Sequence, residues 1–125
     1  GLDDKVIFYG NLKDPSGWYQ QIDLFISNSY SEGLQVAPME AMATGAYVLS
    51  HAWEGADELV PAENLFLTPT EFQEKVLAYC ALSSADQQAA RRRMRAWASD
   101  HFDIRKTIAD ICMVVDEVAA TRLSI

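Results

Sequence analysis

Short, uninterrupted apolar runs alternate with helical segments along the first half of the chain. Four such runs are interpreted as strands, at residues 6–9, 23–27, 46–50 and 64–67. Short apolar strands that are separated by helices are typical of a parallel sheet covered on both faces. This alternation predicts an α/β fold, with a parallel sheet of about four strands and flanking helices.

The first two helices expected after the second run have recognisable ends. Pro38 suits the first turn of a helix, where its missing N–H is not needed. Gly45 suits a left-handed cap that ends the same helix. We expect Thr70 to cap a later helix, because a threonine side chain can accept a hydrogen bond from the first turn.

The last third of the chain predicts a helical tail. Ser83 or Ser84 should start a helix that runs to about residue 100, and Asp103 should open the next one. Apolar residues follow Asp103 at the spacing of one helix face. They are Ile104, Ile108, Ile111, Cys112, Val115 and Val118.

The chain is acidic, with 10 basic and 18 acidic side chains and a formal net charge of −8 at pH 7. A basic surface is needed to bind nucleic acid or an anionic membrane, so we expect no nucleic-acid partner. The basic run at residues 91–95 is interpreted as a solvated helix face that pairs with the acidic half. With 125 residues, the chain suits one domain, and no linker divides it.

Cysteine usage and hydropathy indicate the compartment. Cys80 and Cys112 lie in apolar helical patterns, and we interpret them as small core residues in a reducing compartment, with a disulfide as the alternative. No apolar run approaches the ~20 residues of a membrane span. These features predict a soluble, cytoplasmic chain.

The loop after the second apolar run is the best candidate for a ligand site, because ligands bind beyond the carboxyl ends of strands in such sheets. It contains Ser29, Glu32 and Gly33 and leads into a helix whose free N–H groups favour phosphate. Glu32 and Glu40 flank this helix N-terminus, and carboxylates accept hydrogen bonds from hydroxyl groups. The pattern favours a polyhydroxylated ligand that carries phosphate; the alternative is that both glutamates only stabilise the helix or face solvent.

The same segment resembles a known family. Ser29, Glu32 and Gly33, followed by residues 38–45, resemble the E-x7-E region of retaining glycosyltransferases of the GT-B fold. Three flanking segments are similar to parts of that family, namely residues 6–10, 23–26 and 55–60. The similarity extends from about residue 5 to residue 67. It implies that residues 1–125 form a single partial domain. This would be a truncated, Rossmann-like C-terminal domain of the GT-B fold.

The resemblance implies a role for each matching residue. Glu32 would be the catalytic residue and would contact hydroxyl groups of the donor sugar, while Glu40 would hold the ribose of a nucleotide. Backbone N–H groups of Leu34 and Gln35 would face the sugar and the diphosphate. The complete donor-binding set is Ser29, Glu32, Gly33, Leu34, Gln35 and Glu40. The reaction would transfer a hexose from a nucleoside-diphosphate sugar to an unidentified acceptor with retention, without a metal or other cofactor, since no D-x-D motif is present.

The resemblance also indicates what surrounds this chain. In the family, two strand–helix units that bring an Arg and a Lys to the diphosphate precede this segment, as does an entire acceptor domain. We therefore expect the carboxyl-terminal part of a longer enzyme, cytoplasmic or attached peripherally to the inner membrane through its other parts. Two carboxylates on an acidic half should bind a diphosphate poorly, so we expect the 125 residues alone to be inactive.

Two other functions and one association stay open. The chain could belong to a sugar-nucleotide epimerase of GT-B architecture, or be a non-enzymatic nucleotide-binding or oligomerising module. Exposed edges of a parallel sheet invite pairing, so we expect self-association through them. His51 and Trp53 lie near the expected cleft, where contact with a ligand competes with simple packing.

Overall fold

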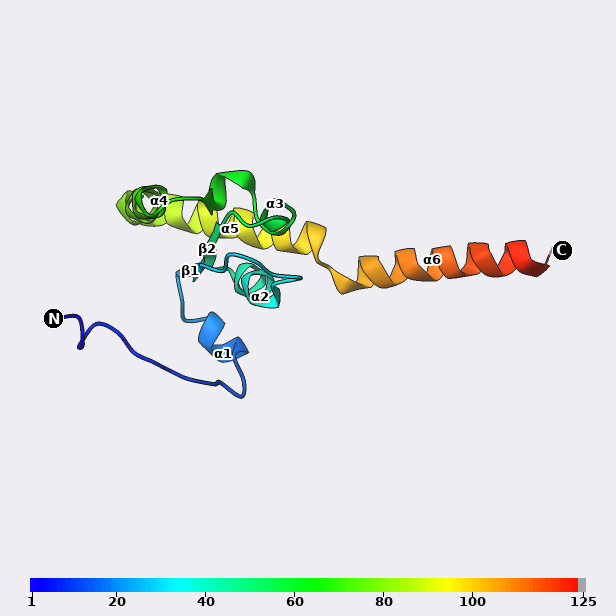
Figure 1. The fold of residues 1–125 in the computed structure, drawn as a ribbon, viewed down its shortest axis with the longest axis horizontal. Helices are drawn as coiled ribbons and strands as arrows, with labels where there is room; N and C mark the ends of the chain where they lie inside the picture. The colour runs from blue at the N-terminus through cyan, green and yellow to red at the C-terminus, as the bar shows by residue number, and fades with distance from the viewer. Residues whose placement is uncertain (124–125) are drawn as a thin grey trace.

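The structure is a computed structural model that describes residues 1–123 (Figure 1). Its elements follow one another as helices that alternate with strands, and then as three consecutive helices. In chain order they are α1 (Ser16–Tyr19), β1 (Leu24–Ser27), α2 (Val36–Thr44), β2 (Tyr47–His51), α3 (Ala56–Leu59), η1 (Ala62–Asn64), β3 (Leu65–Phe66), α4 (Pro69–Ala81), α5 (Ser84–His101) and α6 (Ile104–Leu123).

Within the described residues, the sheet has three strands in the order β1-β2-β3, and both pairings are parallel. Phe25 lies opposite Val48, and Ser50 lies opposite Leu65. The α/β class, the parallel sheet with flanking helices and the helical tail are confirmed. Because all three strands run the same way, their carboxyl ends meet at one edge, where the loop from β1 to α2 begins.

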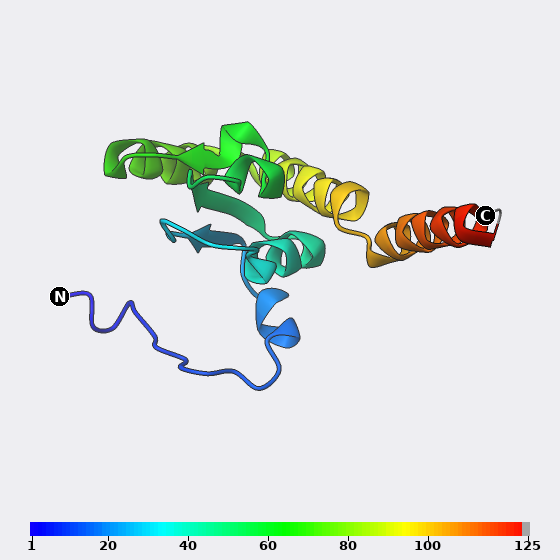
Figure 2. The same ribbon diagram turned by 45° about the vertical axis from the view of Figure 1, so that its right-hand side comes forward.

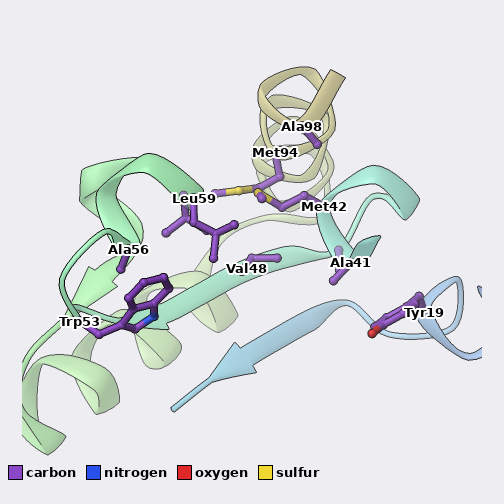
Figure 3. Close-up of a cluster of buried hydrophobic side chains, with 11 residues drawn as sticks. Tyr19, Ala41, Met42, Val48, Trp53, Ala56, Leu59, Met94 and Ala98 are labelled. Atoms are coloured by element: carbon purple, nitrogen blue, oxygen red, sulfur yellow. The ribbon is translucent and has the colours of Figure 1, made fainter. Parts of the chain in front are cut away.

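The core lies between the middle strand and the helices that cover it (Figure 3). Val48 of β2 is fully buried among Met42 of α2, Leu59 of α3 and Met94 of α5. Helix α4 reaches the sheet through aromatic rings, since the ring of Tyr79 stacks on that of Tyr47 with centroids 4.3 Å apart. These contacts hold α2 against the sheet and so fix the position of the β1–α2 loop.

The strand expected at residues 6–9 is wrong. This segment forms no strand, and its side chains are exposed, with Phe8 93% accessible. The N-terminal segment runs away from the sheet in both ribbon views (Figure 2). An apolar run becomes a strand only when a neighbouring strand accepts its backbone hydrogen bonds, and no described strand lies beside it. The sheet therefore has three strands, where about four were expected.

Most predicted helix ends are confirmed. Gly45 ends α2 in the left-handed region, with φ 95° and ψ 21°, and Ser83 caps α5 through a hydrogen bond from the backbone N–H of Asp86. The cap predicted at Thr70 is wrong, because Thr68 caps α4 in a reciprocal capping box with Glu71. Pro69 then occupies the first helical position, which suits its missing N–H.

Helix α6 extends away from the rest of the molecule (Figures 1 and 2). The predicted apolar stripe forms, but it faces solvent, and Ile104 is 64% accessible. Both cysteines are free and exposed, so the prediction that they lie in the core is wrong. Cys80 and Cys112 each belong to a helix whose pattern is apolar, yet no described element covers the side of the helix on which they lie. Among residues 1–123, no helix is long and apolar enough to cross a membrane.

Candidate functional site

A chain of side-chain hydrogen bonds organises the loop between β1 and α2. The Oγ of Ser27, the last residue of β1, donates to Oε1 of Gln35 over 2.8 Å. The Nε2 of Gln35 donates in turn to Oε1 of Glu32 over 3.0 Å. Since Ser27 is buried in the sheet and Gln35 is the N-cap residue of α2, this chain connects Glu32 to two regular elements.

The carboxylate of Glu32 is exposed, and its neighbours favour the ionised form. A hydrogen bond from the side chain of Ser29, and then the one from Gln35, hold the pKa of Glu32 below its ordinary value. The structure thus brings three predicted site residues together, Ser29, Glu32 and Gln35. The group that results is an ionised acceptor that can receive hydrogen bonds from hydroxyl groups.

The N-terminus of α2 follows directly. Gln35 caps it with extended backbone, but its side chain bonds to no N–H of the helix. Gly33 and Leu34 precede it and border a hollow of about 460 Å³, together with the segment from Trp53 to Leu59. The charged residues that line this hollow are all acidic, namely Glu54, Asp57 and Glu58. The N-terminus of α2 favours an anion, but the negative charges around the hollow repel one, so the two effects oppose each other.

Glu40 lies on the second turn of α2 and has a different partner. The hydroxyl group of Tyr19 in α1 donates a hydrogen bond to Glu40, and burial first, then the charge of Glu40, raises the pKa of Tyr19. Glu40 borders a separate hollow of about 630 Å³, where α2 meets α5 and the start of α6. Glu32 thus precedes the N-terminus of α2 and Glu40 lies on its second turn, and neither of these two hollows is lined by both glutamates.

The structure also decides how Trp53 and the basic run of α5 are used. Trp53 is only 9% accessible and packs in the core, although its indole Nε1 has no hydrogen-bond partner among residues 1–123 (Figure 3). Arg91 forms an ion pair with Asp23 over 2.5 Å and donates to the carbonyl oxygen of Gly45 over 2.6 Å. For Arg91, the interpretation as a face that pairs with the acidic half is confirmed.

Sequence reasoning did not single out Tyr19 or the aromatic residues around His51. The rings of Tyr30 and His51 lie 4.3 Å apart, and those of His51 and Phe66 lie 5.7 Å apart. Tyr30 comes from the loop after β1, His51 from the end of β2 and Phe66 from the end of β3. The signal that could have found them is an aromatic or imidazole side chain at the carboxyl end of each run.

Comparison of the sequence with known families identifies the class of protein to which this chain belongs. Residues 1–82 match the family described as glycosyl transferases group 1. The match covers about two thirds of the chain and includes the β1–α2 loop and both glutamates. The chain belongs to this glycosyltransferase family.

Two curated relatives are similar to this chain. A lipopolysaccharide core biosynthesis mannosyltransferase, LpcC of Rhizobium leguminosarum bv. viciae, is 32% identical over 104 residues, which cover 77% of this chain and 30% of the relative. A second lipopolysaccharide core biosynthesis mannosyltransferase, LpsB of Rhizobium meliloti (strain 1021), is 38% identical over 60 residues, which cover 48% of this chain and 17% of the relative. The chain therefore matches less than a third of the length of either relative. No solved structure matches it significantly.

Proposed function

We propose that this chain forms the donor-binding part of a retaining glycosyltransferase that transfers a hexose from a nucleoside-diphosphate sugar to an acceptor. The observation that carries the proposal is the hydrogen-bonded group of Ser29, Glu32 and Gln35 at the start of α2. An ionised carboxylate beside backbone N–H groups of a helix start offers acceptors to sugar hydroxyls and donors to phosphate oxygens. Family membership supports this assignment of the loop.

Within this proposal, each glutamate of the E-x7-E pair has its own part of the donor. Glu32 receives hydrogen bonds from the hexose, and the N–H groups of Leu34 and Gln35 face the sugar and the diphosphate. Glu40 receives the hydroxyls of the ribose. The 630 Å³ hollow supports this division, because Glu40 lines it and Glu32 does not. No metal takes part in the proposed reaction.

Mannose is the hexose that the relatives favour, since both are named as mannosyltransferases. Gln35 borders the sugar in this proposal and holds Glu32 in place. A pocket that hydrogen-bonds a substrate hydroxyl rejects a sugar whose hydroxyl points elsewhere. We accordingly propose GDP-mannose as the donor to test first, with UDP-glucose as the comparison.

We propose that this chain is part of a longer enzyme. Calorimetric titration of that enzyme tests the roles of Glu32 and Glu40 separately. Glu40→Gln should weaken the binding of GDP and GDP-mannose alike, by roughly tenfold, because a hydrogen bond to a charged group is lost. Glu32→Gln should weaken GDP-mannose and leave GDP unchanged. Glu74→Gln, on the exposed face of α4, is the matched control and should change neither. Equal losses of GDP and GDP-mannose in Glu32→Gln would remove Glu32 from the sugar.

We also propose that residues 1–125 alone do not transfer sugar. The hollow beside Gly33 is lined by acidic residues and by no basic residue, so nothing there neutralises a diphosphate. Incubation of the purified 125-residue chain with GDP-[14C]mannose should release neither product nor free mannose. Release of labelled mannose above the background of a Glu32→Gln, Glu40→Gln double variant would refute this proposal.

A further inference from the structure

A third hollow, of about 320 Å³, lies at the carboxyl edge of the sheet. It begins at Ile26 of β1 and is closed by His51 at the end of β2, by Phe66 at the end of β3 and by the first turn of α4. This edge is where ligands of parallel sheets bind. Its volume falls within the range of small-molecule sites. We call this hollow the aromatic hollow; its other lining residues are Asn28, Tyr30, Leu67, Thr68, Pro69 and Phe72.

Ring-shaped side chains form one continuous wall of the aromatic hollow. Tyr30 and His51 have ring centroids 4.3 Å apart, His51 and Phe66 meet edge to face at 5.7 Å, and Phe66 and Phe72 lie 5.0 Å apart. Tyr30 is 74% accessible although it is a large ring, so one side of the wall is open. Such a wall offers flat apolar surface to a ligand that has a flat apolar face.

The polar groups of the aromatic hollow are few and uncharged. Asn28 and Thr68 line it, and none of its lining residues is Asp, Glu, Lys or Arg. The Nδ1 atom of His51 is buried and has no hydrogen-bond partner among the described residues. Because this atom has almost no accessible surface, a ligand in the hollow does not reach it, and the polar groups offered to a ligand are those of the exposed residues Asn28 and Thr68. The lining therefore suits a neutral ligand with hydroxyl groups and does not suit a phosphate.

The position of the aromatic hollow relative to the two glutamates indicates which substrate it would receive. Asn28 and Tyr30, which line the hollow, belong to the same loop as Glu32, although Glu32 is not itself one of the lining residues. Glu40 contacts Tyr19 of α1 instead, and none of the residues around Glu40 borders the aromatic hollow. A donor that extends from Glu32 toward Glu40 would therefore leave the aromatic hollow unoccupied.

We propose that the aromatic hollow binds a pyranose ring of the acceptor glycan. A pyranose has an apolar face of C–H groups, which stacks on the exposed ring of Tyr30, and a rim of hydroxyls, which reaches Asn28 and Thr68. The inference rests on the proposed transferase function. A nucleotide base also stacks on aromatic rings, but its diphosphate would then lie against an uncharged wall.

Ligand-observed NMR on the purified protein tests this inference with free glycosides and without any donor. The probes are methyl α-D-mannopyranoside and methyl β-D-glucopyranoside, with uridine and guanosine as base probes. Saturation transfer to the ring C–H protons of at least one glycoside is expected. Tyr30→Ala should reduce it at least threefold, whereas Tyr30→Phe should retain it because the ring remains. Leu77→Ala, at an exposed position on α4 that lines none of the three hollows, is the matched control and should leave it unchanged.

The outcomes separate this inference from the proposed function. No transfer to either glycoside, or equal transfer in Tyr30→Ala and the unchanged protein, overturns the inference. Transfer to uridine or guanosine that Tyr30→Ala abolishes, with none to the glycosides, assigns the hollow to a base and also overturns it. Donor binding that depends on Glu40 supports the proposed function in either case, because the glycoside probes do not require the donor. The unfolding temperature of each variant, measured in parallel, identifies any variant that fails to fold, and Tyr30→Phe then decides.

Discussion

Gln35 connects the end of β1 to Glu32, because its amide accepts from Ser27 Oγ and donates to Glu32 Oε1 over 2.8 and 3.0 Å. The backbone of Gln35 also caps α2. One residue thus sets the position of the carboxylate relative to the N-terminus of the helix.

Replacement of Gln35 should release Glu32. In Gln35→Ala the hydrogen bond from Nε2 is lost, so the pKa of Glu32 should rise toward its ordinary value. The pKa stays below that value in part, because the hydrogen bond from Ser29 remains. Carboxyl 13C chemical shifts followed through a pH titration measure this change, with Gln21→Ala, in the turn after α1, as the matched control. An unchanged titration midpoint for Glu32 in Gln35→Ala would contradict the prediction.

Gly45 is a glycine at which a side chain should be costly through the backbone conformation alone. Its φ of 95° lies in the region that L-residues rarely adopt, although no atom lies within 4 Å of an added Cβ. Gly45→Ala should therefore destabilise the fold by about 1–2 kcal/mol through backbone strain alone. Urea unfolding measures this value.

Gly17 provides the matched control for Gly45, since an added Cβ there also meets no atom and the residue lies inside α1. Gly17→Ala should be neutral or stabilise the fold by up to ~1 kcal/mol, because alanine favours a helix. Equal destabilisation of the two variants would show that the left-handed cap is not the cause.

The stability of the first turn of α6 should depend on pH through the carboxylate of Asp103. Its carboxylate accepts from the backbone N–H of Arg105 over 3.0 Å and from the guanidinium of the same residue over 2.7 and 2.9 Å. These bonds lower the pKa of Asp103 from 3.8 to about 2. Because the folded value is the lower one, this stabilisation is complete above pH ~4 and is lost as the pH falls through 2.

Circular dichroism at 222 nm, followed from pH 6 to pH 1.5, measures the predicted loss. Asp103→Asn removes the titrating group, so the difference between the unchanged protein and this variant should shrink below pH 4. Asp100→Asn, three residues earlier on α5, is the control. A difference that stays constant between pH 6 and pH 1.5 would be inconsistent with this role of Asp103.

We predict that the chain self-associates, because one edge of β1 is open. β1 pairs only with β2 in the described sheet, and the apolar residues 6–9 are exposed on the same chain. A segment without a partner can pair with the open edge of a second copy. Light scattering should show a mass that rises with concentration, and Phe8→Lys should reduce it, because a charge disfavours edge pairing. A monomer at all concentrations would argue against association.

The comparison of residues 6–9 with β1 explains why some strands could be predicted and one could not. Both segments are short apolar runs that precede polar loops, so their local pattern is the same. β1 becomes a strand because β2 lies beside it, with Leu24 opposite Tyr47. No described strand lies beside residues 6–9. A strand depends on a distant partner, which a local pattern does not reveal.

The candidate site divides in the same way. The contacts of Glu32 were within reach of sequence reasoning, because Ser29 and Gln35 are each three positions away in one loop. The partner of Glu40 was not, since Tyr19 is 21 positions away on another helix. The aromatic hollow draws on the ends of three strands and on α4, and so it exists only after the sheet has formed.

By itself, the sequence determined the features that depend on neighbours along the chain: the α/β alternation, the Gly45 cap, the helical tail and the loop that holds Glu32. Tertiary structure alone decided which apolar run entered the sheet, that Cys80 and Cys112 stayed exposed and that Tyr19 met Glu40. Short-range preferences are set by a few consecutive residues. Burial and side-chain pairing depend instead on segments that are brought together only when the chain packs.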